Sequence, residues 1–226
     1  FTENWEKLEQ YDNNAPKTMN AHLHVLEAYT LLYQCWKDNG LKKRLEFCVD
    51  LFMNRIYDPS RKHFNLFFDN EWNSLVEMDS YGHDVETGWL LCEAARTLEN
   101  QDLIEQTNQL ALDVTEACLA EGMSDKGYMI YEKKGDRKTK HASWWGQIET
   151  VIACVNAWQI SGSDVYLQSV DTVWTFVKDH MVDKEYGEWY SDCFDGEPKK
   201  EAPKVSMWRC PYHTVRLGVE MYNRLK

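Results

Sequence analysis

A repeat of about sixty residues limits the folds that this sequence can adopt. A histidine or a tryptophan marks the same place in successive repeats, and the spacings from His24 to His83, from His83 to Trp145 and from Trp145 to Trp208 are 59, 62 and 63 residues. Between the markers the pattern is helix, tight turn, helix and short aromatic segment, repeated three times and begun a fourth time. Such a period is typical of stacked helical hairpins, because one hairpin cannot cover its own apolar face and needs neighbours. The sequence therefore predicts an all-α array.

Apolar residues at intervals of three and four predict the helices of this array. We expect them near residues 18–38, 41–57, 83–99, 101–119, 143–160, 163–181 and 208–225. The aromatic segments at 63–73, 127–136 and 186–197 carry Gly, Asp or Asn, which predicts β-hairpins or irregular ribbons. Charged faces place the helices near 41 and 101 in an outer layer. The helices that begin near 18, 83, 143 and 208 carry His, Glu and Trp among apolar residues, so they are the inner candidates, with their functional residues at one end.

Length, composition and net charge limit the number of domains and the partners that this chain can have. With 226 residues, 43% of them apolar, the chain can form one core and is one domain or part of one. Its 25 basic and 37 acidic residues give a net charge of -12, which repels phosphate backbones and anionic lipids, so neither nucleic acid nor membrane is expected as a partner. No apolar run approaches the roughly 18 residues of a membrane span, and we find no leader-like start. A soluble protein is expected.

Cysteine usage indicates the compartment. Seven cysteines are an odd number, they are dispersed, and no C-x-x-C pair occurs. Several occupy apolar helical positions, which is typical of reduced thiols in a cytoplasmic protein. The sequence begins with Phe1, so we expect a processed or excised piece of a longer chain.

Polar and aromatic residues gather at the starts of the four inner helices. The groups are "MNAHLHVLEA", "YGHDVE", "WWGQIE" and "MWRCPYH", which contain Asn20, His22, His24, Glu27, Tyr81, His83, Glu86, Trp144, Trp145, Glu149, Trp208, Arg209, Tyr212 and His213. Spacings of three and four place His83 with Glu86, and Trp145 with Glu149, on common helix faces. A lone histidine at such a place is often a satisfied core residue. Four groups in register at one end of an array favour a functional site instead.

A metal site and a glycoside hydrolase site each account for only part of this pattern. His83 and Glu86 have the spacing of a helix-borne pair of metal ligands, but His22 and His24 are two residues apart and diverge on a helix. We therefore expect no metal. Glu86 and Glu149 could be the paired carboxylates of a glycoside hydrolase, a reading that leaves two histidines without a role.

Two histidines that face a cleft suit proton transfer at a sugar carbon. The unperturbed pKa of histidine, about 6.5, lets it remove and return protons near neutral pH. Inversion of a carbon next to a carbonyl needs a base on one face and an acid on the other, and His83 and His213 from opposed helices can supply both. Glu86 can orient an imidazole or hold a sugar hydroxyl. Ten tryptophans and twelve tyrosines provide rings that pack on sugar C–H surfaces. We find no nucleotide-binding glycine motif.

Four motifs in order carry a resemblance to a known family. "MNAHLHVLEAYTLLYQ", "SYGHDVETGWLL", "WWGQIETVIACVNAWQISG" and "KVSMWRCPYHTVR" together resemble the N-acylglucosamine 2-epimerase superfamily, and within it the cellobiose 2-epimerase branch, which includes mannobiose 2-epimerases. The resemblance implies an (α/α)6 barrel, also called an α/α toroid, in which inner and outer helices surround a sugar cleft. It also implies interconversion of β-1,4-linked disaccharides at C2 of the reducing-end sugar, through a cis-enediol or enediolate, without a nucleotide, a metal or another cofactor.

The resemblance assigns roles residue by residue. His83 and His213 match the acid/base pair of the family, and His24 matches a histidine that assists ring opening. The residues that match substrate-binding or orienting polar groups are Asn20, Glu86 and Glu149, and those that match sugar-stacking rings are Trp145 and Trp208. From their positions in the motifs we place Tyr81, Trp89 and Trp144 at the same site, with Trp89 in the wall of the cleft or in the core.

The length of the chain departs from the family pattern. Seven helices are fewer than a complete barrel needs, so residues 1–226 are expected to be the C-terminal portion of one barrel domain, without about the first five helices. An opened barrel exposes apolar sides of inner helices, which predicts self-association. We expect the parent protein to be the epimerase and the piece alone to have weak activity or none. The alternatives left open are a glycoside hydrolase of this fold, an N-acylglucosamine 2-epimerase and a non-catalytic carbohydrate-binding remnant.

Overall fold

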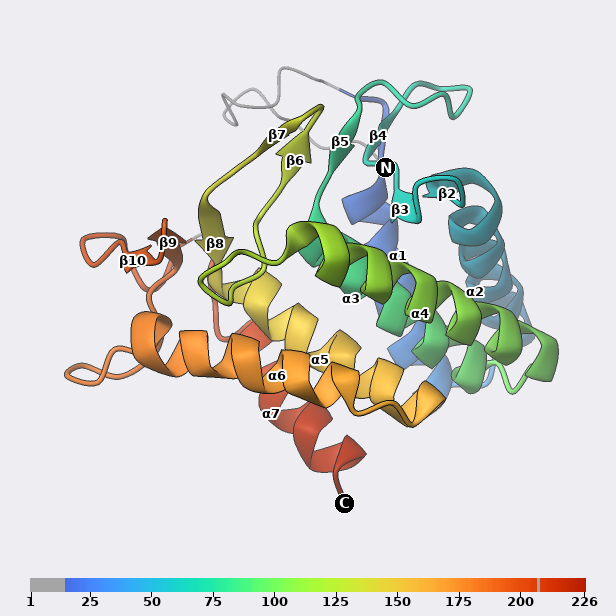
Figure 1. Cartoon of the computed structure of the whole chain (residues 1–226). Coiled ribbons are helices and arrows are strands. Elements are labelled where there is room, and N and C mark those ends of the chain that lie inside the picture. The colour runs from blue at the N-terminus through green and yellow to red at the C-terminus, as the bar shows by residue number, and fades with distance from the viewer. Residues whose placement is uncertain (1–14, 207) are drawn as a thin grey trace. The chain divides into compact units, whose positions relative to one another are not determined.

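The computed structural model describes residues 15–206 and 208–226, which form seven α-helices (Figure 1). They are α1 Met19–Cys35, α2 Asn39–Leu51, α3 Tyr81–Thr97, α4 Gln101–Gly122, α5 Trp144–Ser161, α6 Val165–Phe176 and α7 Tyr212–Arg224. Single π-helical turns, Phe52–Ile56 and Val177–Met181, extend α2 and α6. All seven expected helices are confirmed. The last begins at Tyr212 instead of near 208, because Pro211, which has no N–H to donate, occupies its N-cap.

Short strands precede α1 and lie in the connections that lead into α3, α5 and α7. They are β1 Lys17–Thr18, β2 Tyr57–Asp58, β3 His63–Phe64, β4 Phe67–Phe68, β5 Met78–Asp79, β6 Lys133–Lys134, β7 Arg137–Lys138, β8 His141–Ser143, β9 Asp192–Phe194 and β10 Glu197–Pro198. The pairs β6–β7 and β9–β10 are antiparallel hairpins with two-residue turns. The second turn is Asp195 and Gly196, with φ of 51° and 85°, as a tight hairpin turn requires. The expected ribbons at 127–136 and 186–197 thus become regular strands only near their C-terminal ends.

By its contacts the chain divides into two compact units. The described part of the first unit is residues 15–79 and 90–110, and the second unit contains residues 80–89 with the described residues from 111 onward. None of the helices in residues 15–206 and 208–226 has the length and the hydropathy of a membrane span. The sequence-based assignment of residues 1–226 to one barrel domain stays a prediction.

The first unit is built on α1 and α2, which pack against each other. Thr18 caps α1 by accepting a hydrogen bond from Ala21 N at 3.2 Å, and Asp38 caps α2 from Leu41 N at 2.9 Å. The strand pairs β1–β4 and β2–β3 are antiparallel. The fully buried side chains of this unit include Met19, Leu23, Leu26, Leu45, Phe52, Phe64 and Phe68.

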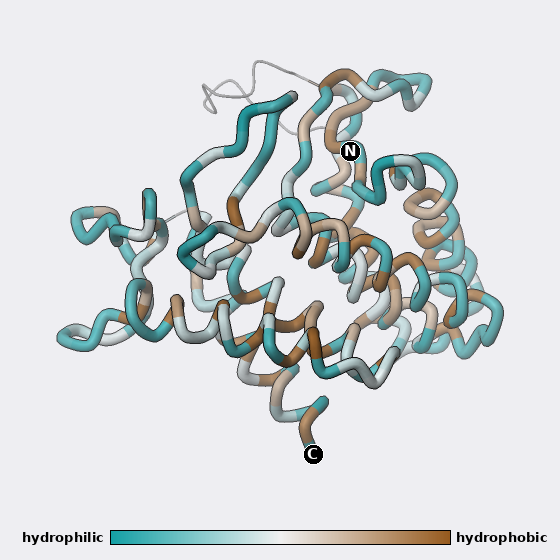
Figure 2. Tube along the Cα trace, viewed as in Figure 1, coloured by the Kyte–Doolittle hydropathy of each residue, from teal (hydrophilic) through white to brown (hydrophobic). Residues whose placement is uncertain are grey.

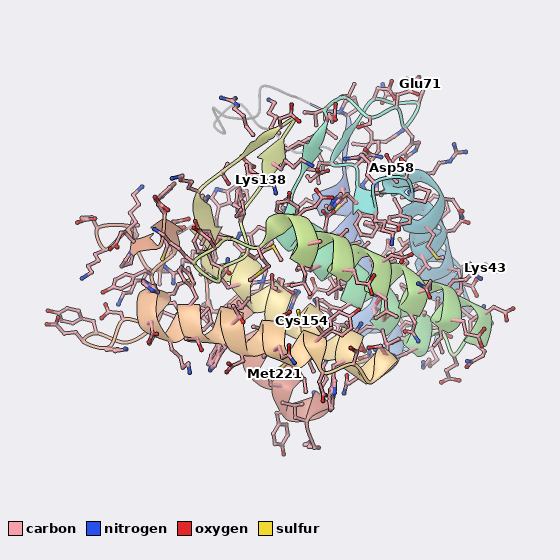
Figure 3. All side chains as sticks on the ribbon, in the orientation of Figure 1. Lys43, Asp58, Glu71, Lys138, Cys154 and Met221 are labelled. Atoms are coloured by element: carbon pink, nitrogen blue, oxygen red, sulfur yellow. The ribbon has the colours of Figure 1, made fainter. Side chains whose placement is uncertain are left out.

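The second unit is built around α5, which packs against both α6 and α7. Every residue of α5 from Gly146 to Ala157 is buried, which supports its expected place as an inner helix. By contrast, α6 mixes hydrophilic and hydrophobic residues, and the β6–β7 hairpin is mostly hydrophilic (Figure 2). Cys154 and Ala157 of α5 form a cluster with Tyr166 of α6, and Figure 3 shows where Cys154 lies. The strands β8, β9 and β10 form one antiparallel sheet, so β9 lies beside the strand that leads into α5.

One face of α7 carries exposed apolar side chains. Val215, Val219 and Tyr222 recur at intervals of four and three residues and are all at least half exposed. The self-association expected from the sequence stays a prediction, and this stripe is one apolar surface of the second unit that could serve it.

Candidate active site

The site of the second unit begins where α3 and α5 start side by side. Gly82 lies so close to α5 that a Cβ at this position would be 2.7 Å from the ring of Trp145. Only glycine therefore lets the first turn of α3 contact the indole ring. This close approach brings His83, the next residue, to the same ring.

Trp145 contacts both histidines of the expected acid/base pair. The centroid of its ring lies 4.6 Å from that of His83 and 5.7 Å from that of His213, and the planes of Trp145 and His213 differ by 29°. The structure thus brings together one histidine from α3, one from α7 and a tryptophan from α5, from segments that are far apart in the sequence. Trp144 also contacts one of these histidines, and its ring meets that of His213 edge to face at 6.2 Å.

Glu149 is the hydrogen-bond partner of His213. Its side chain has no exposed surface, and its Oε1 lies 2.7 Å from Nδ1 of His213. A carboxylate only accepts, so Nδ1 of His213 carries a proton and Nε2 is the nitrogen that can exchange one. Trp89 donates from Nε1 to Oε2 of Glu149 at 2.9 Å, so this tryptophan supports the carboxylate from within the core.

Arg216 is a residue of the site that the sequence reading missed. Its Nη1 donates to Oε1 of Glu86 at 2.6 Å and to Oε1 of Glu149 at 3.1 Å, and both carboxylates are buried. The guanidinium also lies over the rings of Trp89 and Tyr212, at 5.3 and 4.2 Å. Its positive charge offsets part of the cost of burying two carboxylates. A sequence signal did exist, since "HTVR" places Arg216 three residues after His213 on the same helical face.

Oxygen and nitrogen atoms of Glu86, Glu149 and His213 lie within 4.8 Å of one another, a spacing that a metal ion could bridge. The guanidinium of Arg216 bonds to both carboxylates, so a positive charge already occupies this position. The donor set therefore fits an arginine-bridged pair of carboxylates better than a metal centre.

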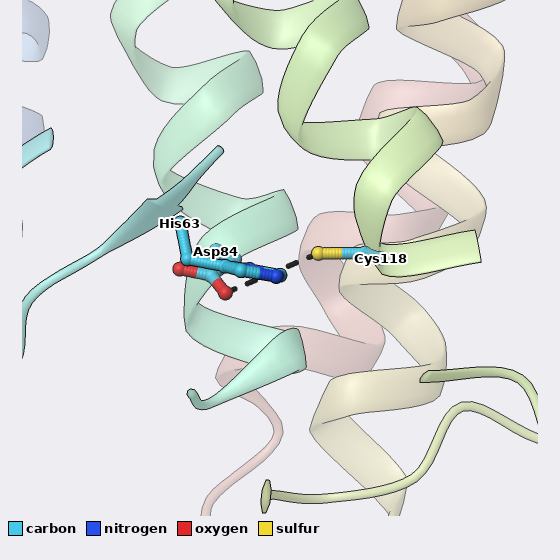
Figure 4. Close-up of side chains that lie close together, drawn as sticks. All are labelled: His63, Asp84 and Cys118. Atoms are coloured by element: carbon cyan, nitrogen blue, oxygen red, sulfur yellow. Dashed lines mark hydrogen bonds between the residues drawn. The ribbon is translucent and has the colours of Figure 1, made fainter. Parts of the chain in front are cut away.

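His83 has a different partner from His213. Its Nδ1 lies 2.8 Å from the hydroxyl oxygen of Ser80, and its backbone carbonyl accepts from Thr87 Oγ1 at 2.7 Å. Next to it in the sequence, Asp84 is fully buried, and Cys118 lies 4.0 Å away from its Oδ2 (Figure 4). The sequence reading also missed Ser80, because a serine before a helix reads as an ordinary cap.

Two residues of the expected site have surroundings that the motifs did not indicate. Tyr81 is fully buried, and a Cβ on Gly122 would be 2.8 Å from its ring, so the ring packs in the core of the second unit. Trp208 is 78% exposed, and its backbone N–H donates to Ser206 Oγ at 3.3 Å. Their expected roles in binding and stacking stay predictions.

His24 and Asn20 belong to the first unit. The side chain of His24 is 45% exposed, and its Nδ1 lies 3.2 Å from Oε2 of Glu27. Asn20, one turn earlier on α1, is half-buried. The neighbouring His22 contacts the carbonyl of Thr18 at 2.6 Å, and burial lowers its pKa. The structure describes these residues within their own unit, so their roles beside His83 stay predictions.

Helical hairpins that carry histidines and tryptophans at the starts of inner helices define a protein of the α/α-toroid class. More narrowly, residues 2–216 match the family model for N-acylglucosamine 2-epimerase (GlcNAc 2-epimerase), and the chain belongs to this family, as its motifs predict. A curated relative, the cellobiose 2-epimerase of Bacteroides fragilis, is 40% identical over 95% of this chain and 55% of its own length.

Solved structures give the same result. A sugar epimerase from a ruminal bacterium matches with a TM-score of 0.92 and 34% identity, over 97% of this chain and 57% of that one. The cellobiose 2-epimerase of Bacillus thermoamylovorans B4167 matches with a TM-score of 0.89 and 36% identity. The match covers 93% of this chain and 54% of that one. The expected fold, part of an (α/α)6 barrel, is confirmed. The chain spans little more than half the length of the cellobiose 2-epimerase and of the two solved structures named here.

Proposed function

We propose that the protein to which this chain belongs is a cofactor-independent epimerase that inverts C2 of the reducing-end sugar in β-1,4-linked disaccharides. The observation that carries the proposal is the contact of one tryptophan ring, Trp145, with both His83 and His213. A flat ring beside two imidazoles suits a sugar that stacks on the indole and meets a proton carrier on each side. The relatives named cellobiose 2-epimerase support cellobiose as the first substrate to test, rather than an N-acyl sugar, and the resemblance of the motifs adds mannobiose.

In the proposed reaction the two histidines exchange protons with opposite faces of C2. After the reducing-end ring opens, Nε2 of one imidazole takes the C2 proton, and the electron pair forms a C1–C2 double bond with negative charge on O1. The other imidazole then gives its proton to the opposite face of C2 and the C1 carbonyl re-forms. No electron is gained or lost overall. Glu149 keeps Nδ1 of His213 protonated throughout, so that this ring works through Nε2. His24 would assist ring opening, and Trp208 would provide a second stacking surface.

The glycoside hydrolase alternative has weaker support. A hydrolase needs one protonated and one ionised carboxyl group on either side of the glycosidic bond. Here Glu86 and Glu149 accept hydrogen bonds from the same nitrogen of Arg216, an arrangement that favours two carboxylates, and both are buried. We assign both glutamates to orienting the histidine and the substrate.

The test is NMR of cellobiose and of β-1,4-mannobiose in D2O, with the chain and with the chain extended by the N-terminal helices that the resemblance to the family implies. The proposal predicts deuterium at C2 together with the C2 epimer, at a higher rate in the extended protein. Free monosaccharide without exchange at C2 would support the hydrolase instead. Absence of both, in a protein that binds the sugars, would support a carbohydrate-binding remnant.

We also propose the cytoplasm as the location of the protein. All seven cysteines lie within the described residues and none forms a disulfide, which is consistent with a reducing compartment.

A further inference from the structure

The serine that precedes α3 uses its side chain differently from the residues that cap α1 and α5. A capping hydroxyl ordinarily accepts a hydrogen bond from a backbone N–H of the first turn. Ser143 follows this rule at α5, where its Oγ accepts from Gly146 N at 3.2 Å. Thr18 does the same at α1. At α3 the hydroxyl of Ser80 instead lies 2.8 Å from Nδ1 of His83, while its carbonyl accepts from Asp84 N at 2.9 Å.

Other groups stabilise the start of α3, where the Ser80 hydroxyl does not cap a backbone N–H. Asp84 lies in the first turn of α3, where an acidic side chain interacts favourably with the positive end of the helix dipole. Thr87 donates to the carbonyl of His83 and so fixes the backbone that carries the imidazole. Ser80 is itself 3% exposed, so water does not compete freely for its hydroxyl. The side chain is thus held in a buried place with its oxygen at the imidazole.

The partners of the two imidazoles differ in charge and in what they can do. A carboxylate such as Glu149 only accepts, so it fixes the proton of the His213 ring on Nδ1. A serine hydroxyl is neutral and can either donate to Nδ1 or accept from it. The hydroxyl of Ser80 can therefore hold the His83 ring in the same orientation in either tautomer.

We propose that Ser80 is the positioning residue of His83, and that its hydroxyl holds the ring against Trp145 with Nε2 as the proton-exchanging nitrogen. The two imidazoles are then unlike, with His213 set by a carboxylate and His83 by a hydroxyl. The catalytic consequence rests on the proposed function, but the placement of the ring does not.

The structural part is tested by 15N NMR of the histidine rings in the chain. Ser80→Ala should change the ring-nitrogen shifts of His83 and its tautomer ratio, and leave those of His213 in place. Ser80→Thr, which keeps a hydroxyl, should restore them. The matched control is Ser143→Ala, which removes a capping hydroxyl of the same kind and should lower the melting temperature without moving the His83 signals. If Ser80→Ala does not fold, Ser80→Gly removes the same hydroxyl and leaves an acceptable cap.

Unchanged His83 signals in Ser80→Ala or Ser80→Gly would overturn the proposal. It would also be overturned if the only effect of the substitution were a fall in melting temperature equal to that of Ser143→Ala.

The catalytic part is tested in the extended protein by the rate of C2 exchange. There Ser80→Ala should lower kcat roughly 10- to 100-fold because the base is misplaced, with KM within about twofold, and Ser80→Thr should recover most of it. An inactive wild type would contradict the proposed function and leave the ring-nitrogen result to decide the role of Ser80.

Discussion

Nδ1 of His213 and Oε1 of Glu149 lie 2.7 Å apart, and the carboxylate is completely buried. The two residues come from different helices, α7 and α5, 64 positions apart in the sequence. A buried carboxylate at this distance fixes both the rotation of the imidazole and the nitrogen that carries its proton. The proposed acid/base chemistry of His213 therefore depends on a residue that need not touch the substrate.

Glu149→Gln tests this dependence. The amide keeps the volume of the side chain but removes the charge and can present a donor to Nδ1, which would favour the wrong tautomer. By analogy with other carboxylate–histidine pairs, we expect the rate of C2 exchange by the extended protein to fall roughly 10²- to 10⁴-fold. The matched control is Glu46→Gln, which changes a partly exposed glutamate 3.9 Å from Lys42 and should leave the rate unchanged. Equal rates in the two variants would contradict the role of Glu149.

Arg216→Met should destabilise the fold of the second unit. Removal of the guanidinium leaves Glu86 and Glu149 buried without their shared positive partner, which costs about 3–5 kcal/mol for a buried ion pair that loses one member. Urea unfolding followed by circular dichroism measures the loss. Arg137→Met, at an exposed position of β7, is the control and should change the free energy of unfolding by less than about 0.5 kcal/mol. A similar small change in Arg216→Met would show that the carboxylates do not need the arginine.

The cysteines should divide into two reactive and five protected thiols. Cys35 and Cys210 are exposed, whereas the other five are buried. Burial raises the pKa of Cys48 to about 11 and those of Cys154 and Cys193 to about 12, so these three thiols also stay protonated at neutral pH. Titration with a disulfide reagent should give two fast thiols in the folded chain and seven in denaturant. Five or more fast thiols without denaturant would contradict this division.

The Asp192 carboxylate should stabilise the folded chain at neutral pH and lose this contribution as the pH becomes acidic. Burial raises its pKa, but hydrogen bonds from His141 and Ser191 lower it by more, so the folded value lies below the unfolded one. The contribution is therefore fully present above the unfolded pKa of about 3.9 and is lost as the pH falls through the folded value. His141→Ala removes the partner at 2.6 Å and should move the acid-unfolding midpoint to higher pH. An unchanged midpoint would show that this pair does not control the titration.

The sequence predicted most of the helical framework because its signals are periodic. Apolar spacing located all seven helices, and the recurrence from His24 to Trp208 identified the array. Boundaries were less predictable where one residue decides them, as Pro211 does at the start of α7. The hairpin of β9 and β10 depends likewise on the left-handed conformations of Asp195 and Gly196.

The sequence predicted the histidines of the site, but it did not predict the residues that hold the site in place. His83, Trp145 and His213 have chemistry that stands out within apolar helices, and the structure brings them together. Arg216 and Ser80 read as an ordinary surface arginine and an ordinary cap, because their partners, Glu86 and His83, are defined by three-dimensional packing. Sequence also could not show that Glu86 and Glu149 are both buried, since burial follows from neighbours that local spacing does not reveal.

The most direct test of the two-histidine account follows the C2 proton of each epimer separately. The extended protein, its His83→Asn variant and its His213→Asn variant are incubated in D2O with cellobiose and, in parallel, with glucosyl-mannose. The account predicts that wild type exchanges and interconverts both sugars, whereas each variant exchanges C2 of one epimer only, a different one for each variant, and forms no inverted product. Interconversion that survives the loss of either histidine would contradict the account.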